Sequence, residues 1–148
     1  MKKVLVAYFS LTGNTEKMAE YIAEGVRFSG HQAVTKKVSD IKSADGLAGY
    51  DGYIFGSPTY YRDVAEPVKT FLFLGRKANL NGKLGGAFGS YTHDGSAPAI
   101  IFDTMQYVFK MEPFELGPFN LKEDILETSE GLRACQDYGR VFGEKLGS

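Results

Sequence analysis

The stretch that decides the fold is residues 3–15, KVLVAYFSLTGNT. Residues 3–9 form a short, continuous apolar run, which is typical of a strand buried on both faces. Residues 10–15 combine three hydroxyl side chains, an amide and a glycine, with no cation. Apolar residues then recur with helical spacing at Met18, Ala19, Ile22, Ala23 and Val26. The stretch therefore predicts a strand, a polar loop and an amphipathic helix.

The same alternation continues to the end of the chain. Further strands are predicted at residues 32–38, 51–56 and 83–90, with a weaker one at 113–121, and further helices at 66–74, 97–111 and 129–146. The buried side of the helix at 97–111 is expected to comprise Ile100, Ile101, Met105, Val108 and Phe109. That of the last helix is expected to comprise Leu132, Cys135, Tyr138, Phe142 and Leu146. Tyr107, Phe109 and Phe114 are also expected in the core, although an exposed patch there could dock a partner. Five strands alternating with helices predict an α/β three-layer sandwich with a five-stranded parallel sheet.

Length and composition limit the possible classes of protein. A chain of 148 residues with 24% charged residues fits one globular domain, residues 1–148. The net charge of -1 does not favour a nucleic-acid partner, and no apolar run approaches the ~20 residues that a membrane-spanning helix needs. Cys135 is the single cysteine, which fits a cytoplasmic location, and His31 and His93 are too far apart in sequence to suggest a zinc site.

The loops that follow the strands are the places to look for a ligand, because parallel sheets bind ligands beyond the carboxyl ends of their strands. In the loop at residues 10–15, backbone N–H groups at a helix N-terminus can hold a phosphate without a lysine, and Gly13 allows a tight turn. Thr12 or Asn14 could instead be a simple helix cap, but a cap needs only one such residue. Because GxxxxGKS/T and GxGxxG motifs are absent, a monophosphate ester is favoured over a nucleoside triphosphate or a dinucleotide.

Two further loops carry aromatic residues. Residues 57–63 read SPTYYRD and residues 89–95 read GSYTHDG. Either loop alone is compatible with an ordinary turn, and the tyrosines offer flat apolar faces with polar tips. Together with the phosphate loop, they predict a site for a flat heteroaromatic phosphate ester.

These residues resemble a known family. Residues 10–15 match the flavodoxin phosphate-loop pattern S/T-x-T-G-x-T, and residues 51–58 (DGYIFGSP) and 88–91 (FGSY) resemble the segments that lead into its flavin loops. The chain resembles short-chain flavodoxins, and the similarity is closest to the flavodoxin-like domain of A-type flavoproteins. This resemblance implies the flavodoxin-like fold, with strand order 2-1-3-4-5, and one non-covalently bound FMN.

The resemblance also implies the residues that bind FMN. The phosphate is assigned to Ser10, Leu11, Thr12, Gly13, Asn14 and Thr15. One side of the isoalloxazine is assigned to Pro58, Thr59, Tyr60 and Tyr61, with Arg62 near its polar rim. The other side is assigned to Ser90, Tyr91, Thr92, His93 and Gly95. No catalytic residue and no metal ligand are assigned.

The expected function is that of a monomeric carrier that shuttles low-potential electrons between redox partner proteins. The alternative is an FMN-dependent NAD(P)H:quinone-type reductase on the same fold. A signalling receiver domain is excluded, because the first and third strands do not end in aspartates. Three features differ from typical flavodoxins: the charge is nearly neutral, residues 57–63 contain no glycine, and His93 stands where many relatives have a larger aromatic. We therefore expect weaker stabilisation of the one-electron-reduced flavin and a potential that depends on pH.

Overall fold

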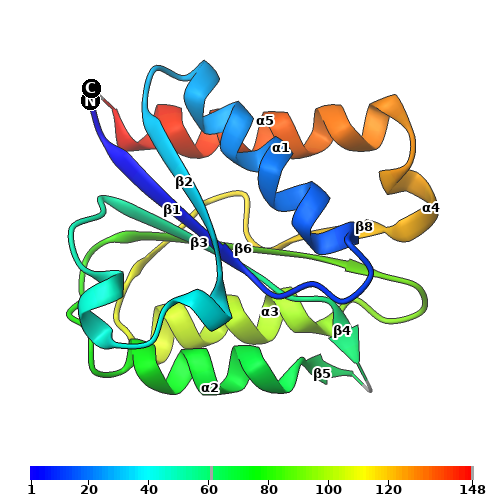
Figure 1. Ribbon diagram of the computed structural model, residues 1–148. Coiled ribbons are helices and arrows are strands. Elements are labelled where there is room, and N and C mark those ends of the chain that lie inside the picture. The colour runs from blue at the N-terminus through cyan, green and yellow to red at the C-terminus, as the bar shows by residue number, and fades with distance from the viewer. Residues whose placement is uncertain (61, 148) are drawn as a thin grey trace.

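The computed structural model describes residues 1–60 and 62–147. Strands and helices alternate along the chain (Figure 1). The strands are β1 (Lys3–Tyr8), β2 (Gln32–Lys37), β3 (Gly52–Gly56), β4 (Thr59–Tyr60), β5 (Asp63–Val64), β6 (Leu84–Tyr91), β7 (Glu112–Pro113) and β8 (Phe119–Lys122). The α-helices are α1 (Asn14–Phe28), α2 (Glu66–Gly75), α3 (Ser96–Asp103), α4 (Glu123–Leu126) and α5 (Ser129–Leu146). Short 3-10 turns η1 (Val38–Asp40) and η2 (Ala44–Leu47) follow β2, and a π-helical turn, η3 (Thr104–Val108), extends α3.

The parallel sheet has the order β2-β1-β3-β6, and both β7 and β8 pair with β6. The expected order 2-1-3-4-5 is confirmed, with the fifth strand in two pieces. The prediction of one continuous strand over residues 113–121 is wrong. Phe114, which is only 1% exposed, still donates its N–H to Gly85 O of β6, and a turn closed by the hydrogen bond from Gly117 N to Phe114 O then separates the pieces. Gly117 has φ 73°, a conformation that glycine adopts at little cost.

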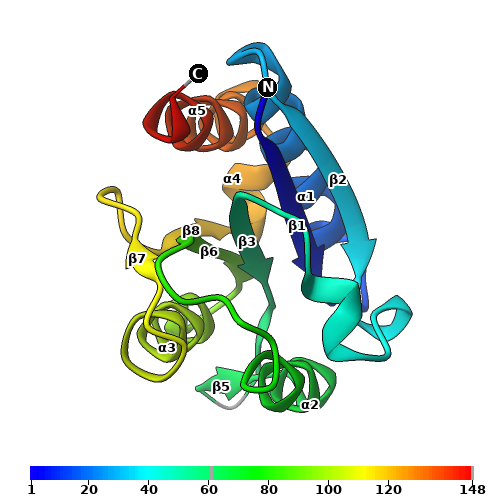
Figure 2. The same ribbon diagram turned by 90° about the vertical axis from the view of Figure 1, so that its left-hand side faces the viewer.

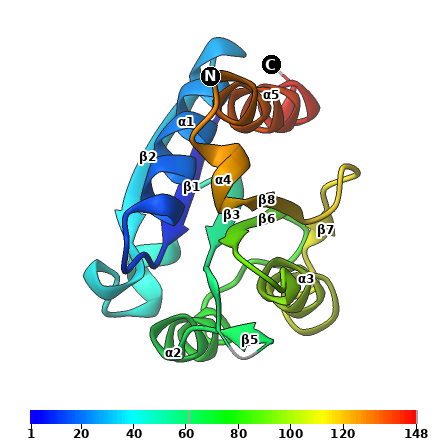
Figure 3. The same cartoon turned by 90° about the vertical axis from the view of Figure 1, so that its right-hand side faces the viewer.

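Helices cover both faces of the sheet, as the end-on views in Figures 2 and 3 show. On β1, Leu5 and Ala7 belong to the core beneath α2 and α3, whereas Val4 and Val6 belong to the core beneath α1 and α5. This two-sided burial explains why the strand is an unbroken apolar run and not an alternating one. No helix in the described part of the chain is both long and apolar enough to cross a membrane.

Glycines allow α1 and α5 to pack closely on one face. A Cβ added to Gly139 of α5 would lie 1.9 Å from the backbone oxygen of Ile22, and one added to Gly25 of α1 would lie 1.9 Å from that of Gln136. The helices therefore touch backbone to backbone at these positions. This contact fixes the position of α1, whose first turn follows the polar loop at residues 10–15.

The π-helical turn changes which residues of the 97–111 segment are buried. Phe109 N donates to Thr104 O, five residues back, at 3.1 Å, so the turn holds one residue more than an α-helical turn. Phe109 is 7% exposed, as predicted for the core, but Val108 is 52% exposed and Tyr107 64% exposed. The predictions that Val108 and Tyr107 are buried are both wrong. The prediction for Val108 assumed an unbroken 3.6-residue period.

Candidate functional site

Three loops meet at the edge of the sheet where the strands end. They follow β1, β3 and β6, which are neighbours in the sheet, at residues 10–13, 57–58 with the β4–β5 hairpin, and 92–95. Figure 3 looks onto this edge. The topology therefore brings to one place those residues of the predicted site that the structure describes.

The first loop leaves the start of α1 open. Gly13 has φ 91°, its N–H donates to Ser10 Oγ at 3.0 Å, and α1 has no side-chain cap. The first bond of the helix runs from Lys17 N to Gly13 O. Among the described residues, the N–H groups of Asn14, Thr15 and Glu16 find no acceptor. An anion can take these donors, as at other helix N-termini.

Side chains in this loop differ in exposure. Leu11 is 70% exposed, Thr12 and Gly13 are also exposed, Asn14 is half-buried, and Thr15 is 1% exposed. Lys17, the first cation of α1, pairs with Glu127 at 3.6 Å. Because residues 10–15 contain no cation and Lys17 is paired with Glu127, the loop offers an anion only backbone dipoles and hydroxyl groups.

A buried hydroxyl pair joins the first loop to the third. Thr15 Oγ1 lies 3.1 Å from Ser90 Oγ, and Ser90 is 2% exposed. This bond connects the first turn of α1 to the end of β6, 75 residues further along the chain. It holds in place two segments that were predicted separately from the sequence.

The second loop is held from beneath. Ser57 and Pro58 are buried, and Ser57 Oγ accepts a hydrogen bond from Ala65 N at 3.2 Å. Thr59 Oγ1 accepts one from Ala97 N at 2.9 Å, which ties the loop to the first turn of α3. Tyr61, which was assigned to the flavin, lies outside the described residues.

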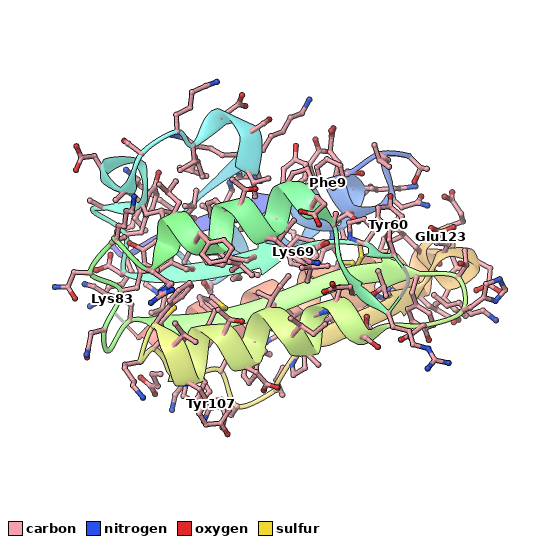
Figure 4. All side chains as sticks on the ribbon, turned by 90° about the horizontal axis from the view of Figure 1, so that it is seen from below. Phe9, Tyr60, Lys69, Lys83, Tyr107 and Glu123 are labelled. Atoms are coloured by element: carbon pink, nitrogen blue, oxygen red, sulfur yellow. The ribbon has the colours of Figure 1, made fainter. Side chains whose placement is uncertain are left out.

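Tyr60 lies beside the start of α4, and Figure 4 shows it at the same end of the molecule as Glu123. The residue is 36% exposed. Partial burial, and secondarily the charge of Glu123, raise the pKa of Tyr60 above its ordinary value. The phenol therefore stays neutral at physiological pH.

Arg62 adopts a left-handed backbone conformation, with φ 62°. Such a conformation costs a non-glycine residue about 1–2 kcal/mol, so the glycine-free loop takes this shape against the preference of its sequence. Arg62 Nε lies 3.5 Å from Asp94 Oδ2, which links the second loop to the third. Asp94 also accepts hydrogen bonds from the backbone N–H and the hydroxyl of Ser96 at the start of α3.

The third loop has an exposed tip and a fixed base. Tyr91 is half-buried, and Thr92 and His93 are exposed. At the base, the Asn120 side chain donates to Gly95 O at 2.8 Å, and a Cβ at Gly95 would lie 2.9 Å from that side chain. Asn120, Asp94 and Glu123 were not among the site residues predicted from the sequence. The topology was the available signal, because the end of the fifth strand must lie next to the end of β6.

The sequence model of the flavodoxin family matches residues 6–115. The chain belongs to the flavodoxin family. A solved flavodoxin from the domain Archaea superimposes with a TM-score of 0.87 at 30% identity, covering 99% of both chains. The expected resemblance and fold are thereby confirmed.

Two other relatives are longer proteins than this chain. A putative diflavin flavoprotein A 3 of Synechocystis sp. is 30% identical over 148 residues, covering 97% of this chain and 24% of that protein. An NAD(P)H dehydrogenase (quinone) of Cupriavidus metallidurans is 32% identical over 126 residues, covering 69% of this chain and 63% of that protein. This flavodoxin-family chain thus spans less than two thirds of either relative.

Flavodoxins bind FMN, and the residues at this edge fit that cofactor. Nothing lies within 4 Å of the Cβ position of Gly13, so the loop is open on the side where the free N–H groups of α1 begin. N–H and hydroxyl donors in a loop that contains no cation suit a phosphate monoester. Tyr60 and Tyr91, in the two neighbouring loops, are only partly covered and offer rings to a flat heterocycle.

Proposed function

We propose that residues 10–15 bind the phosphate of FMN, that residues 58–62 and 90–95 hold its isoalloxazine, and that the protein carries electrons between redox partner proteins. Bound FMN supplies the one- and two-electron redox chemistry. The protein binds and orients the cofactor and sets the electrostatic field around it. We further propose that it acts as a monomer in the cytoplasm.

One observation carries the proposal: three N–H groups at the start of α1, behind a left-handed glycine, have no acceptor among the described residues. A helix that merely ended in solvent would gain from a side-chain cap, and Asn14 or Thr15 could have been placed to provide one. Instead, Thr15 is bonded to Ser90 and Ser10 is bonded to Gly13. The hydroxyls thus shape the loop, and the N–H groups remain for a ligand.

The charges at the site favour a low potential. An unpaired cation beside a flavin stabilises the extra negative charge that reduction creates. The cation of the second loop, Arg62, is instead paired with Asp94, and Glu123 lies beside Tyr60. The site therefore offers little compensation for added electrons.

Binding experiments with FMN and riboflavin test the phosphate site directly. The wild-type apoprotein is expected to bind FMN much more tightly than riboflavin, because only FMN carries the phosphate. Gly13→Ala introduces strain at φ 91° and is expected to weaken FMN binding by about tenfold or more. Gly30→Ala is the matched control, since Gly30 has φ 93°, is equally uncrowded, and lies past the other end of α1. Equal FMN affinity in the two variants would overturn the assignment.

The second candidate function is reduction of a substrate by NAD(P)H, which the similarity to the quinone dehydrogenase favours. A carrier oxidises NAD(P)H only slowly without a partner, whereas a reductase oxidises it rapidly when a quinone is added. We expect FMN-loaded protein mixed with NADPH and a soluble quinone to show little turnover. Rapid turnover would replace the carrier with the reductase while leaving the FMN site intact.

A further inference from the structure

A groove of about 530 Å³ lies between α2 and α3–η3, on the opposite side of the sheet from α1 and α5. Figure 4 looks onto these two helices, which run side by side. The apolar part of its lining is Val64, Leu72, Phe73, Ile100 and Val108. The groove extends along the helices away from the three site loops, so its far end, at Arg76 and Val108, serves no evident role in holding FMN.

The π-helical turn opens the far end of this groove. The ring of Phe109 turns inward and packs on Gly75, where an added Cβ would lie 2.8 Å from the ring. Val108 consequently turns outward and is 52% exposed. Phe73 on α2 is 66% exposed and stands on the rim. Exposed side chains of this size, gathered on one concave face, are typical of interaction sites.

The charges around α2 are mostly positive. A second groove of about 470 Å³ lies on the other side of Phe73, between α2 and η1. Across the two grooves the charged lining residues are Lys42, Lys69, Arg76, Lys77 and Asp63. Asp63 is paired with Lys69. Within the described part of the chain, Arg76 and Lys77 make no ion pair, and the sequence contains no acidic residue between Glu66 and Asp94.

From this apolar groove with a cationic rim, we propose that the α2–α3 groove binds an acidic amphipathic helix of a partner protein. The apolar face of such a helix would lie against Leu72, Phe73 and Val108, in the manner of other helix-in-groove complexes. Its acidic flank would face Arg76, which lines the groove, and the neighbouring Lys77, which lines the second groove, and this gives charge complementarity. A concave groove fits a helix better than it fits a flat lipid surface.

The probe for the test is a fluorescent synthetic peptide of ~18 residues, or about five helical turns, with leucines on one face and glutamates elsewhere. A second peptide has the same composition but no apolar face. Fluorescence anisotropy with FMN-loaded protein is expected to show saturable binding of the first peptide only. Absence of saturable binding, or equal binding of both peptides, would overturn the proposal.

Four variants locate the binding site. Phe73→Ser and Arg76→Glu are each expected to weaken peptide binding by about tenfold or more. Phe28→Ser is the control for the aromatic, since Phe28 on α1 is 61% exposed, and Lys145→Glu on α5 is the control for the cation. All four replace exposed side chains, and thermal melting checks that each variant is folded. Losses of the same size in the controls would contradict the proposal.

Two further measurements distinguish other occupants. Sedimentation velocity that shows self-association abolished by Phe73→Ser would assign the groove to a second copy of this chain. Co-sedimentation with vesicles of phosphatidylserine and phosphatidylcholine that depends on Phe73 would assign it to a membrane. Either result would overturn the peptide-helix proposal, whereas changes in amide NMR shifts along α2 and η3 on peptide addition would support it.

Discussion

Replacing Thr15 by valine tests whether the hydroxyl pair between α1 and β6 holds the candidate phosphate loop in place. Thr15 Oγ1 lies 3.1 Å from Ser90 Oγ, and the two residues are 1% and 2% exposed. Thr15→Val keeps the branched shape but leaves the Ser90 hydroxyl buried without this partner. An unpaired buried polar group costs about 1–3 kcal/mol, so we expect the free energy of unfolding of the apoprotein to fall by about that amount.

The reverse change and the double variant complete a cycle. Ser90→Ala leaves the Thr15 hydroxyl unpaired and is expected to cost a similar amount. The double variant leaves neither hydroxyl unpaired, so its loss should be smaller than the sum of the single losses by about 1 kcal/mol or more. Urea unfolding followed by circular dichroism measures all four proteins. Thr70→Val, at an exposed position on α2, is the control and should change stability by less than about 0.5 kcal/mol.

FMN titration of the same proteins shows whether the Thr15 hydroxyl only supports the loop or also contacts the phosphate of FMN. A hydroxyl that only supports the loop gives equal losses of FMN affinity in Thr15→Val and Ser90→Ala. If Thr15 also contacts the phosphate, Thr15→Val loses more affinity than Ser90→Ala does. Single losses of unfolding free energy that add to within about 0.5 kcal/mol in the double variant would refute the pairing.

Three other outcomes are expected. Gly139→Ala should lower the free energy of unfolding by about 1–3 kcal/mol, because the added Cβ would lie 1.9 Å from the Ile22 backbone oxygen. An unchanged melting temperature would contradict the close contact between α1 and α5. Asp94→Asn removes a negative charge and frees Arg62, so in a redox titration the one-electron potential of bound FMN should rise by about 20–40 mV, from a charge effect of about 0.5–1 kcal/mol. Burial raises the pKa of Cys135 from 9.0 to about 12. The folded state therefore keeps the thiol protonated, and the stability that this contributes is complete below pH 9 and declines as the pH rises toward 12. The decline should be shallower in Cys135→Ala in urea titrations.

The parts of the fold that could be predicted are those whose pattern is local. A strand buried on both faces must be apolar along its buried length, as in residues 4–8, and the apolar residues of a helix packed on one side must recur about every 3.6 residues, as in α5. These constraints act within a few residues of one another. They account for the agreement over β1, α1, β3, β6 and α5.

The parts that could not be predicted depend on departures from local periods. One additional residue in the π-helical turn η3 turns Val108 outward, and the order of apolar residues in this segment does not indicate such a turn. The break in the fifth strand did have a signal, because Gly117-Pro118 is a turn dipeptide. The pairs Thr15–Ser90 and Arg62–Asp94 join segments far apart in the chain, so a single sequence offers no means to find them.

Binding and redox potential are coupled in the site that we propose. Dipoles of N–H groups and hydroxyls at the start of α1 can hold a phosphate, but they carry no net charge to cancel it. At the second loop, Asp94 offsets part of the charge of Arg62, whose exposed side chain is also screened by solvent. Electrons added to the site therefore meet the uncompensated charge of the phosphate and of nearby Glu123, which disfavours reduction. A cation introduced into residues 10–15 would relieve this effect, so the lack of a lysine in the loop that binds the phosphate would also help keep the potential low.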